Sequence, residues 1–170
     1  IFNHNFESYD KNGLTPLFFM VTTNNLNCVK KIMEKNIDIN NSGNIAGVNI
    51  FEYVLRQGSE EMINLISKYD IDLNYTNDFG DTYLHGIFLS EKGTYKEELI
   101  TKLLKKVDNF DIQNIDGNSI VHLLAKNNEL IKYIDFFNNR LINIALINKE
   151  GKTALDYLSK KDKSIFLKAI

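Results

Sequence analysis

Five glycines recur at nearly equal spacing, and this periodicity constrains the fold more than any other feature of the chain. They are separated by 34, 33, 37 and 34 residues and stand in matching contexts, at Gly13, Gly47, Gly80, Gly117 and Gly151. A polar residue and an apolar run follow each of them. Self-similarity with a period of about 20 to 50 residues is the signature of a repeat protein, in which no unit buries its apolar face alone. The sequence therefore predicts a short array of stacked units.

Two helical patterns and an extended tail recur between the glycines. The first helix of a unit is expected to begin after Thr15, Thr82, Ser119 or Thr153, because Thr and Ser are good N-caps. The second, longer helices are predicted over 26–33, 60–67, 97–106, 129–137 and 163–170, and the tails over 37–40, 71–74, 110–113 and 144–147. The apolar positions of the first helices are expected to point into the stack, at Leu17, Phe51, Leu84, Val121 and Leu155.

This arrangement resembles the ankyrin repeat, whose signature is a turn, G-x-T-P-L-H, a helix, a second turn, a second helix and a D-x-N tail. The unit from Asp10 to Asn40 matches this signature in unbroken register. The third and fourth units keep the Leu84-His85 and Val121-His122 pairs. The resemblance covers nearly the whole chain. It implies an all-α fold, an ankyrin-repeat solenoid of stacked helix-turn-helix units with β-hairpin-like loops.

The resemblance also defines the expected domain organisation. One array is predicted over 1–170, with repeats one to five at about 10–40, 44–74, 77–111, 114–145 and 148–170. Residues 1–9 resemble the tail of a preceding repeat. Repeat three carries about four extra residues within 90–96, and such insertions in repeat arrays map to loops. This insertion is either a contact element or a tolerated surface insertion.

Composition and charge exclude several classes of protein. No apolar run approaches the roughly 20 residues that span a bilayer, so no membrane partner is expected. The formal net charge of -2 lacks the concentrated basic surface that binding to nucleic acid requires. Cys28 is the single cysteine, which excludes an internal disulfide framework and zinc modules with several cysteines. With no visible targeting segment, an intracellular, cytoplasmic location is the expectation.

The residues that could carry chemistry have structural explanations. His85 and His122 fall on the histidine of the signature, and the resemblance implies that they bridge backbone groups of adjacent repeats. Neither they nor His4 show the ligand spacing of a zinc site. Cys28 sits at an apolar position, where a free thiol behaves as a small hydrophobe, and no neighbouring base or oxyanion site is visible. No enzyme activity, cofactor, metal or catalytic residue is therefore expected.

The resemblance implies that a partner protein binds the concave surface, which the hairpin tips and the exposed side of the first helices form. The register assigns seven residues to this surface: Phe19, Tyr53, Arg56, Tyr75, Phe79, Leu123 and Tyr157. The tips add Tyr9, Ile45 and Ile115. Exposed aromatic stripes mark interaction sites, and aromatic and arginine side chains dominate binding energies. The alternative is that these side chains are half buried between repeats and serve packing.

The expected function is protein–protein interaction without catalysis. Two alternatives stay open. The chain could be a substrate-recruiting or regulatory segment of a larger enzyme, or a pathogen-encoded effector that mimics a host inhibitor of NF-κB type. A monomer is expected, with self-association through the N-terminal end as the alternative. Nothing in the residues identifies the partner.

Overall fold

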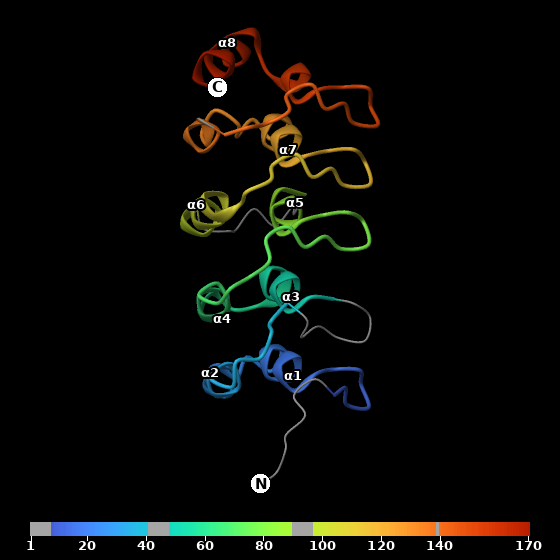
Figure 1. The fold of residues 1–170 in the computed structure, drawn as a ribbon, viewed down its shortest axis with the longest axis vertical. Coiled ribbons are helices and arrows are strands. Elements are labelled where there is room, and N and C mark those ends of the chain that lie inside the picture. Colours follow the sequence, from blue (N-terminus) through green and yellow to red (C-terminus); the bar gives the residue numbers. More distant parts are fainter. Residues whose placement is uncertain (1–7, 41–47, 90–96, 139) are drawn as a thin grey trace. The chain divides into compact units, whose positions relative to one another are not determined.

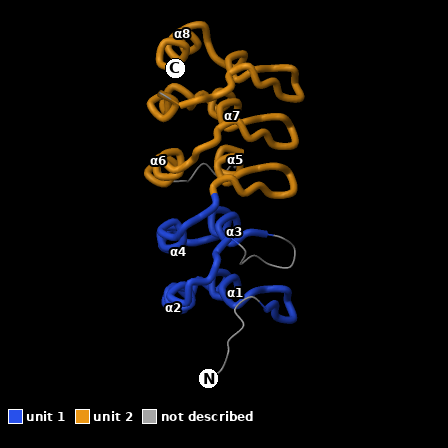
Figure 2. The backbone as a smooth tube through the Cα atoms, in the orientation of Figure 1, with its two compact units in different colours: residues 1–72 blue, residues 73–170 orange. Residues whose placement is uncertain are grey.

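The computed structural model describes residues 8–40, 48–89, 97–138 and 140–170. Its described residues form helices, with no β-strand among them, and the chain divides into two compact units, 1–72 and 73–170 (Figures 1 and 2). The continuity of one array over 170 residues stays a prediction. The positions of Ile45, the proposed tail before Ser8 and the insertion at 90–96 lie outside the described residues.

The first unit contains two helix pairs, one for each of repeats one and two. They are α1 (Pro16–Thr22), α2 (Leu26–Met33), α3 (Ile50–Gln57) and α4 (Glu60–Ile66). Side chains cap all four helices: those of Thr15, Asn25, Asn49 and Ser59 accept a backbone N–H from the first turn. Helix α1 packs on α2 and α3, and α4 packs on α2 and α3. The pairs therefore stack with a shared apolar core.

The second unit contains repeats three to five. Its elements are α5 (Tyr83–Leu89), α6 (Glu97–Lys106), α7 (Ile120–Lys126), the 3-10 helices η1 (Ile134–Phe136) and η2 (Ala154–Tyr157), and α8 (Lys160–Ala169). Helix α7 packs against both α5 and η2, and α8 packs against η1. The loops that precede α5, α7 and η2 project to one side of this unit, away from α6 and α8 (Figure 1). We call these loops, and the loop that precedes α1 in the first unit, the tips.

The apolar register of the first helices is largely confirmed. Leu17, Phe51, Leu84 and Val121 are buried, whereas Leu155 is half-buried. The second helices of repeats one and three have the predicted bounds. Among the described residues, no helix combines the length and the apolar character that crossing a membrane would require.

One predicted second helix was wrong, and another begins earlier than predicted. The expected helix over 129–137 is instead a series of turns that includes the single 3-10 turn η1, and its buried Tyr133 and Phe137 contact Phe88 and Phe110 of repeat three. In repeat five the second helix begins at Lys160 rather than 163. The first helix of this repeat is only the short η2, and Ser159 then caps α8 by accepting the N–H of Asp162.

Phe137 joins the three repeats of the second unit. Its side chain is fully buried, and its ring centroid lies 5.1 Å from that of Phe110 and 6.1 Å from that of Phe166. Phe110 belongs to repeat three and Phe166 to repeat five. Edge-to-face aromatic contacts of this kind add to the stabilisation that burial alone gives.

Arg140 fixes the end of α6 from the following repeat. Its guanidinium donates to the carbonyl oxygens of Leu104, Lys105 and Val107, at 3.4, 3.3 and 2.5 Å. The same group lies over the ring of Phe110, 5.2 Å from the centroid. Because the last carbonyls of a helix have no partner within the helix, one arginine supplies several of the missing donors.

Gly117 and Gly151 offer a matched test of how closely the tips approach each other. Both have φ above +70° (74° and 72°). A Cβ on Gly117 would lie 2.9 Å from Cα of Asn148, whereas a Cβ on Gly151 would meet nothing within 4 Å. Gly151→Ala is therefore expected to lower the free energy of unfolding by about 1 kcal/mol through backbone strain alone. Gly117→Ala is expected to cost about 2 kcal/mol. Urea denaturation of both variants measures the difference, and equal losses would contradict the close approach.

Candidate partner-binding surface

The tips take their shape from one side chain at the start of each turn. The described turns begin at Asp10, Asn77, Asn114 and Asn148. Each side-chain oxygen accepts the backbone N–H groups two and four residues later, at 2.8 to 3.1 Å. A short side chain that bonds to its own backbone in this way holds a tight turn in one conformation. The tips are thus defined locally, by sequence.

Hydrogen bonds also connect neighbouring tips in the second unit. The N–H of Ile115 donates to the carbonyl of Phe79 at 2.7 Å, and the N–H of Lys149 donates to the carbonyl of Asp116 at 2.9 Å. Side-chain hydrogen bonds connect the same tips: Asn114 donates to Asp81 and Asn148 donates to Asn118, both at 2.8 Å. The tips of repeats three, four and five therefore form one continuous edge.

Large apolar side chains are exposed on this edge. Phe79 is 61% exposed and Ile115 is 54% exposed. Because the main chains of these two residues are hydrogen-bonded to each other, their side chains project from adjacent points of the edge. Burying such side chains in a complex would remove their apolar surface from water, at about 25 cal/mol for each Å².

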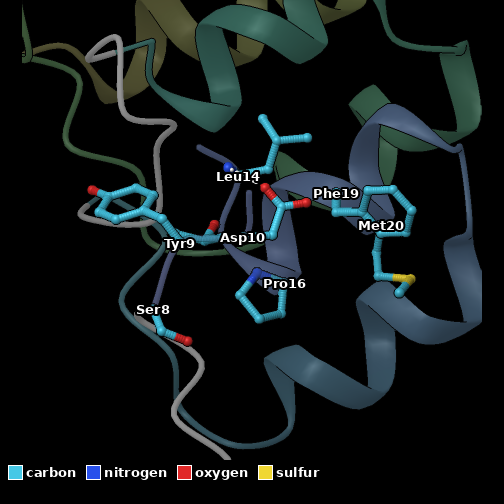
Figure 3. A pocket seen from close by; sticks show the side chains of 8 residues that line it. Ser8, Tyr9, Asp10, Leu14, Pro16, Phe19 and Met20 are labelled. Carbon is cyan, nitrogen blue, oxygen red and sulfur yellow. Dashed lines mark hydrogen bonds between the residues drawn. The ribbon is translucent and has the colours of Figure 1, made fainter. Parts of the chain in front are cut away.

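The first unit carries an apolar pocket of its own. A cavity of about 260 Å³ lies between the tip of repeat one and the start of α1, and Tyr9, Leu14, Pro16, Phe19 and Met20 supply its apolar lining (Figure 3). Tyr9 is 51% exposed and Phe19 is 42% exposed. Both tip and helix therefore present aromatic side chains to solvent in repeat one.

The three residues predicted for the partner surface in the first unit differ in what they contact. Phe19 is exposed beside the pocket. Tyr53 is half-buried, with its ring centroid 5.1 Å from that of Phe18. Arg56 is exposed and forms an ion pair with Glu52 one helical turn earlier, at 2.9 Å. Of the three, Phe19 has the largest apolar surface still open to a partner.

In the second unit, the prediction for Leu123 was wrong. Its side chain is only 2% exposed, because α7 is covered by α5 on one side and by η2 on the other. Tyr75 is half-buried and stacks on Tyr83, with ring centroids 5.4 Å apart. Phe79 is exposed, as expected for a tip residue.

Tyr157 belongs to a charged cluster that the sequence did not reveal. Its hydroxyl accepts a hydrogen bond from Asn148 at 2.8 Å, and the ammonium groups of Lys152 and Lys126 lie 5.0 and 5.8 Å from its ring centroid. Both lysines also contact Glu150, at 3.1 and 3.2 Å. Hydrogen bonds from Lys152, Lys126 and Tyr157 lower the pKa of Glu150 to about 2. Glu150 therefore stays ionised near neutral pH, and Tyr157 is half-buried in this cluster.

The two histidines of the signature bridge adjacent repeats, as predicted. Nε2 of His85 lies 2.9 Å from the carbonyl oxygen of Asn118, and Nδ1 lies 2.8 Å from Oγ1 of Thr82. His122 makes the same pattern with the carbonyls of Leu146 and Lys152 and with Ser119. Since a carbonyl only accepts, Nε2 carries the proton, and Nδ1 accepts from the Thr or Ser hydroxyl. Both rings have a structural role.

Burial of these rings makes the stability of the second unit depend on pH. Desolvation lowers the pKa of both His85 and His122 below the ordinary value of 6.5. Below that pH the unfolded chain binds protons that the folded chain does not, so the free energy of unfolding falls as pH decreases. We expect the free energy of unfolding to fall between about pH 7.5 and about pH 5.5. Each histidine contributes at most about 1.4 kcal/mol per pH unit to this loss. Urea titrations at the two pH values measure this loss, and unchanged stability would contradict it.

Cys28 is half-buried rather than part of the core. Its side chain lies in the first turn of α2, where its backbone N–H donates to the capping side chain of Asn25 at 3.1 Å. Within the described ranges, no three His, Cys, Asp or Glu side chains gather as a metal ion would require.

Arg140 and the Glu150 cluster were missed from sequence alone. The chain has 18 lysines and only two arginines, so an arginine at the polar break before the tail of repeat four was itself a signal. No comparable signal marked Glu150, because charged residues at a tip are ordinary on a solvated surface.

Comparison with known proteins agrees with this geometry. A family model described as ankyrin repeats (three copies) matches residues 1–77. A protein of Acanthamoeba polyphaga mimivirus that is named for its ankyrin repeats is 29% identical over 180 residues, which cover 91% of this chain and 23% of the relative. The chain thus spans under a quarter of that relative's length.

Two solved structures show the fold. The ankyrin repeat domain of Bcl-3, from the IkappaB protein family, has a TM-score of 0.70 at 16% identity, and the match covers 96% of this chain and 71% of that one. A chain in the complex of a Bdellovibrio bacteriovorus predatory endopeptidase with an immunity protein has a TM-score of 0.64 at 22% identity, covering 95% and 80%. Residues 1–77 thus match the ankyrin-repeat family, and the chain has the fold of an ankyrin-repeat solenoid.

Proposed function

We propose that this chain is a protein-interaction module that binds a partner protein through the tips and first helices of its repeats, without catalysis. Ankyrin repeats are protein–protein interaction modules. The observation that carries the proposal is the exposure of Phe19 and Phe79, at 42% and 61%, on elements that their own hydrogen bonds hold in place.

A rigid presentation of these side chains favours binding. The Asn77 side chain fixes the turn that carries Phe79, and the Ile115 N–H bonds to the carbonyl of Phe79. Groups that are already ordered lose little conformational freedom in a complex, so more of the burial energy appears as affinity. Aromatic side chains gain most from this, because they bury a large area with few rotatable bonds.

The absence of catalysis is proposed from the partners of the titratable groups. Both ring nitrogens of His85 and of His122 are hydrogen-bonded to structural groups. A general base must keep one nitrogen open towards its substrate. The remaining candidate, Cys28, has no histidine among its described hydrogen-bond partners.

Affinity capture with single variants tests the interaction function. Proteins retained by the tagged wild-type chain are quantified by mass spectrometry against Phe19→Ala and Phe79→Ala. Loss of one buried aromatic anchor is expected to weaken retention about tenfold or more. Leu141→Ala is the matched control, because Leu141 is fully exposed but lies outside the tips, just before the tail of repeat four. Retention that is unchanged in both phenylalanine variants would reject these surfaces as the binding site.

The viral relative favours a narrower second proposal, in which the module engages a protein of an infected host. The relative is encoded by Acanthamoeba polyphaga mimivirus, and this chain matches less than a quarter of it. A module of that kind within a longer protein would recruit a host factor. Capture from Acanthamoeba lysate, compared with a bacterial lysate, should then yield a partner only from the former, and its loss in Phe79→Ala would place it on the tips.

A further inference from the structure

Negative charge is concentrated around the exposed apolar side chains of repeats three and four. From Leu73 to Leu89 and from Phe110 to Ala125, the chain has four carboxylates and no lysine or arginine. Asp78 and Asp116 are exposed and directly adjoin Phe79 and Ile115. The side chains of Asp78, Phe79, Ile115 and Asp116 are together called the acidic tip surface below.

The four side chains lie next to one another on ordered backbone. The Ile115 N–H donates to the Phe79 carbonyl at 2.7 Å, and a Cβ on Gly80 would lie only 3.2 Å from Cα of Asn114. The two tips are therefore in van der Waals contact. An exposed apolar pair with a carboxylate beside each member is thus a fixed feature of the second unit.

Lys149 adjoins this surface, because its N–H donates to the carbonyl oxygen of Asp116. Lys126 and Lys152 share the carboxylate of Glu150 in repeat five. Among the described residues, no ion pair holds Asp78, Asp116 or Lys149. The histidines of both repeats are buried and carry lowered pKa values, so they add no positive charge near neutral pH. The two tip carboxylates remain open to a cation from outside.

We propose that the acidic tip surface binds a short basic segment of a partner protein, in which a large apolar side chain stands beside lysine or arginine. The inference rests on the proposed interaction function and specifies its partner chemistry. The apolar side chain would cover Phe79 and Ile115, while the cations face Asp78 and Asp116. An acidic segment or a nucleic acid would instead place like charges against these carboxylates, which opposes association.

Selection from a library of short random peptides displayed on phage tests this chemistry without knowledge of the natural partner. The purified 170-residue chain is the target, and enriched peptides are expected to combine a large apolar residue with neighbouring Lys or Arg. A synthetic enriched peptide should bind Asp78→Asn/Asp116→Asn about five- to tenfold more weakly than wild type. It should also bind more weakly as ionic strength rises, because salt screens exposed charges.

The control variant carries the same change in charge on the other side of the same repeats. Asp108→Asn/Asp135→Asn alters two exposed carboxylates outside the tips and should leave peptide binding unchanged. Circular dichroism confirms that both double variants fold. Asp81 is left intact, because it accepts a hydrogen bond from Asn114.

Four results would overturn the inference. Enrichment of neutral or acidic peptides that still require Phe79 would reject the basic partner segment but would agree with the proposed interaction function. No enrichment, or binding that ignores both the aspartates and Phe79, would remove the tip surface. If light scattering shows dimers that Asp78→Asn/Asp116→Asn dissociates, the occupant is a second copy of this chain and the partner segment is rejected.

Discussion

Replacing Phe137 by alanine is expected to lower the free energy of unfolding of the second unit by about 3 to 5 kcal/mol. The side chain is fully buried, and its ring contacts Phe110 and Phe166 from the repeats on either side. Alanine would leave a cavity where three repeats meet. Because the stability of a repeat array depends on the contacts between neighbouring units, this loss affects two interfaces at once. Urea denaturation followed by circular dichroism measures it.

Phe136→Ala is the matched control for this variant. Phe136 is the preceding residue and has the same side chain, but it is half-buried, and its ring centroid lies 6.3 Å from that of Tyr133. Phe136→Ala should lower the free energy of unfolding clearly less than Phe137→Ala, because a partly exposed site leaves a smaller cavity. Equal losses for Phe136→Ala and Phe137→Ala would show that Phe137 does not join the repeats.

His85→Leu is expected to destabilise the second unit by about 2 to 4 kcal/mol, since each buried donor left without an acceptor costs about 1 to 3 kcal/mol. The His85 ring is fully buried, and its Nδ1 accepts from both the hydroxyl and the N–H of Thr82, at 2.8 and 3.2 Å. Leucine fills a similar volume but accepts no hydrogen bond. The variant also removes the donor to the Asn118 carbonyl, which connects repeats three and four. Thermal and urea unfolding both report the loss.

Gly86, the next residue, supplies a control variant that is expected to raise stability rather than lower it. Gly86 lies within α5, and a Cβ added there would meet nothing within 4 Å. Gly86→Ala is therefore expected to stabilise the helix by up to about 1 kcal/mol. If His85→Leu unfolds at the same urea concentration as wild type while Gly86→Ala shifts upwards, the histidine bridge contributes nothing to stability.

Local signals in the sequence predicted the parts of the fold that local interactions determine. The spacing of the glycines located the tips, and Thr15 and Ser119 marked the starts of first helices. The second helix of repeat four was not predictable in this way. Its apolar residues satisfy a helical period, but the observed turns bury Tyr133 and Phe137 against neighbouring repeats. There, tertiary packing outweighs local periodicity.

The partner surface was predicted less well, because exposure depends on the neighbours of each repeat. The register that placed Phe19 correctly on the surface also placed Leu123 there, and Leu123 is buried. Tyr75 and Tyr157 are large side chains at surface positions, yet each is held by a contact that no sequence pattern specifies. The charge around Phe79, by contrast, could be counted directly in the sequence.

The bonds between tips have a consequence for how such a chain changes in length. Asn114 and Asn148 occupy the same position of their repeats and donate to Asp81 and Asn118, which also share a position. A duplicated repeat would carry both the donor and the acceptor of this hydrogen bond. Whole repeats could therefore be gained or lost, and each new pair of neighbouring repeats would still form the bond. The clamp of Arg140 on the end of α6 is different, because it occurs at one junction of the described chain. A change in length that separated repeats three and four would therefore remove these hydrogen bonds.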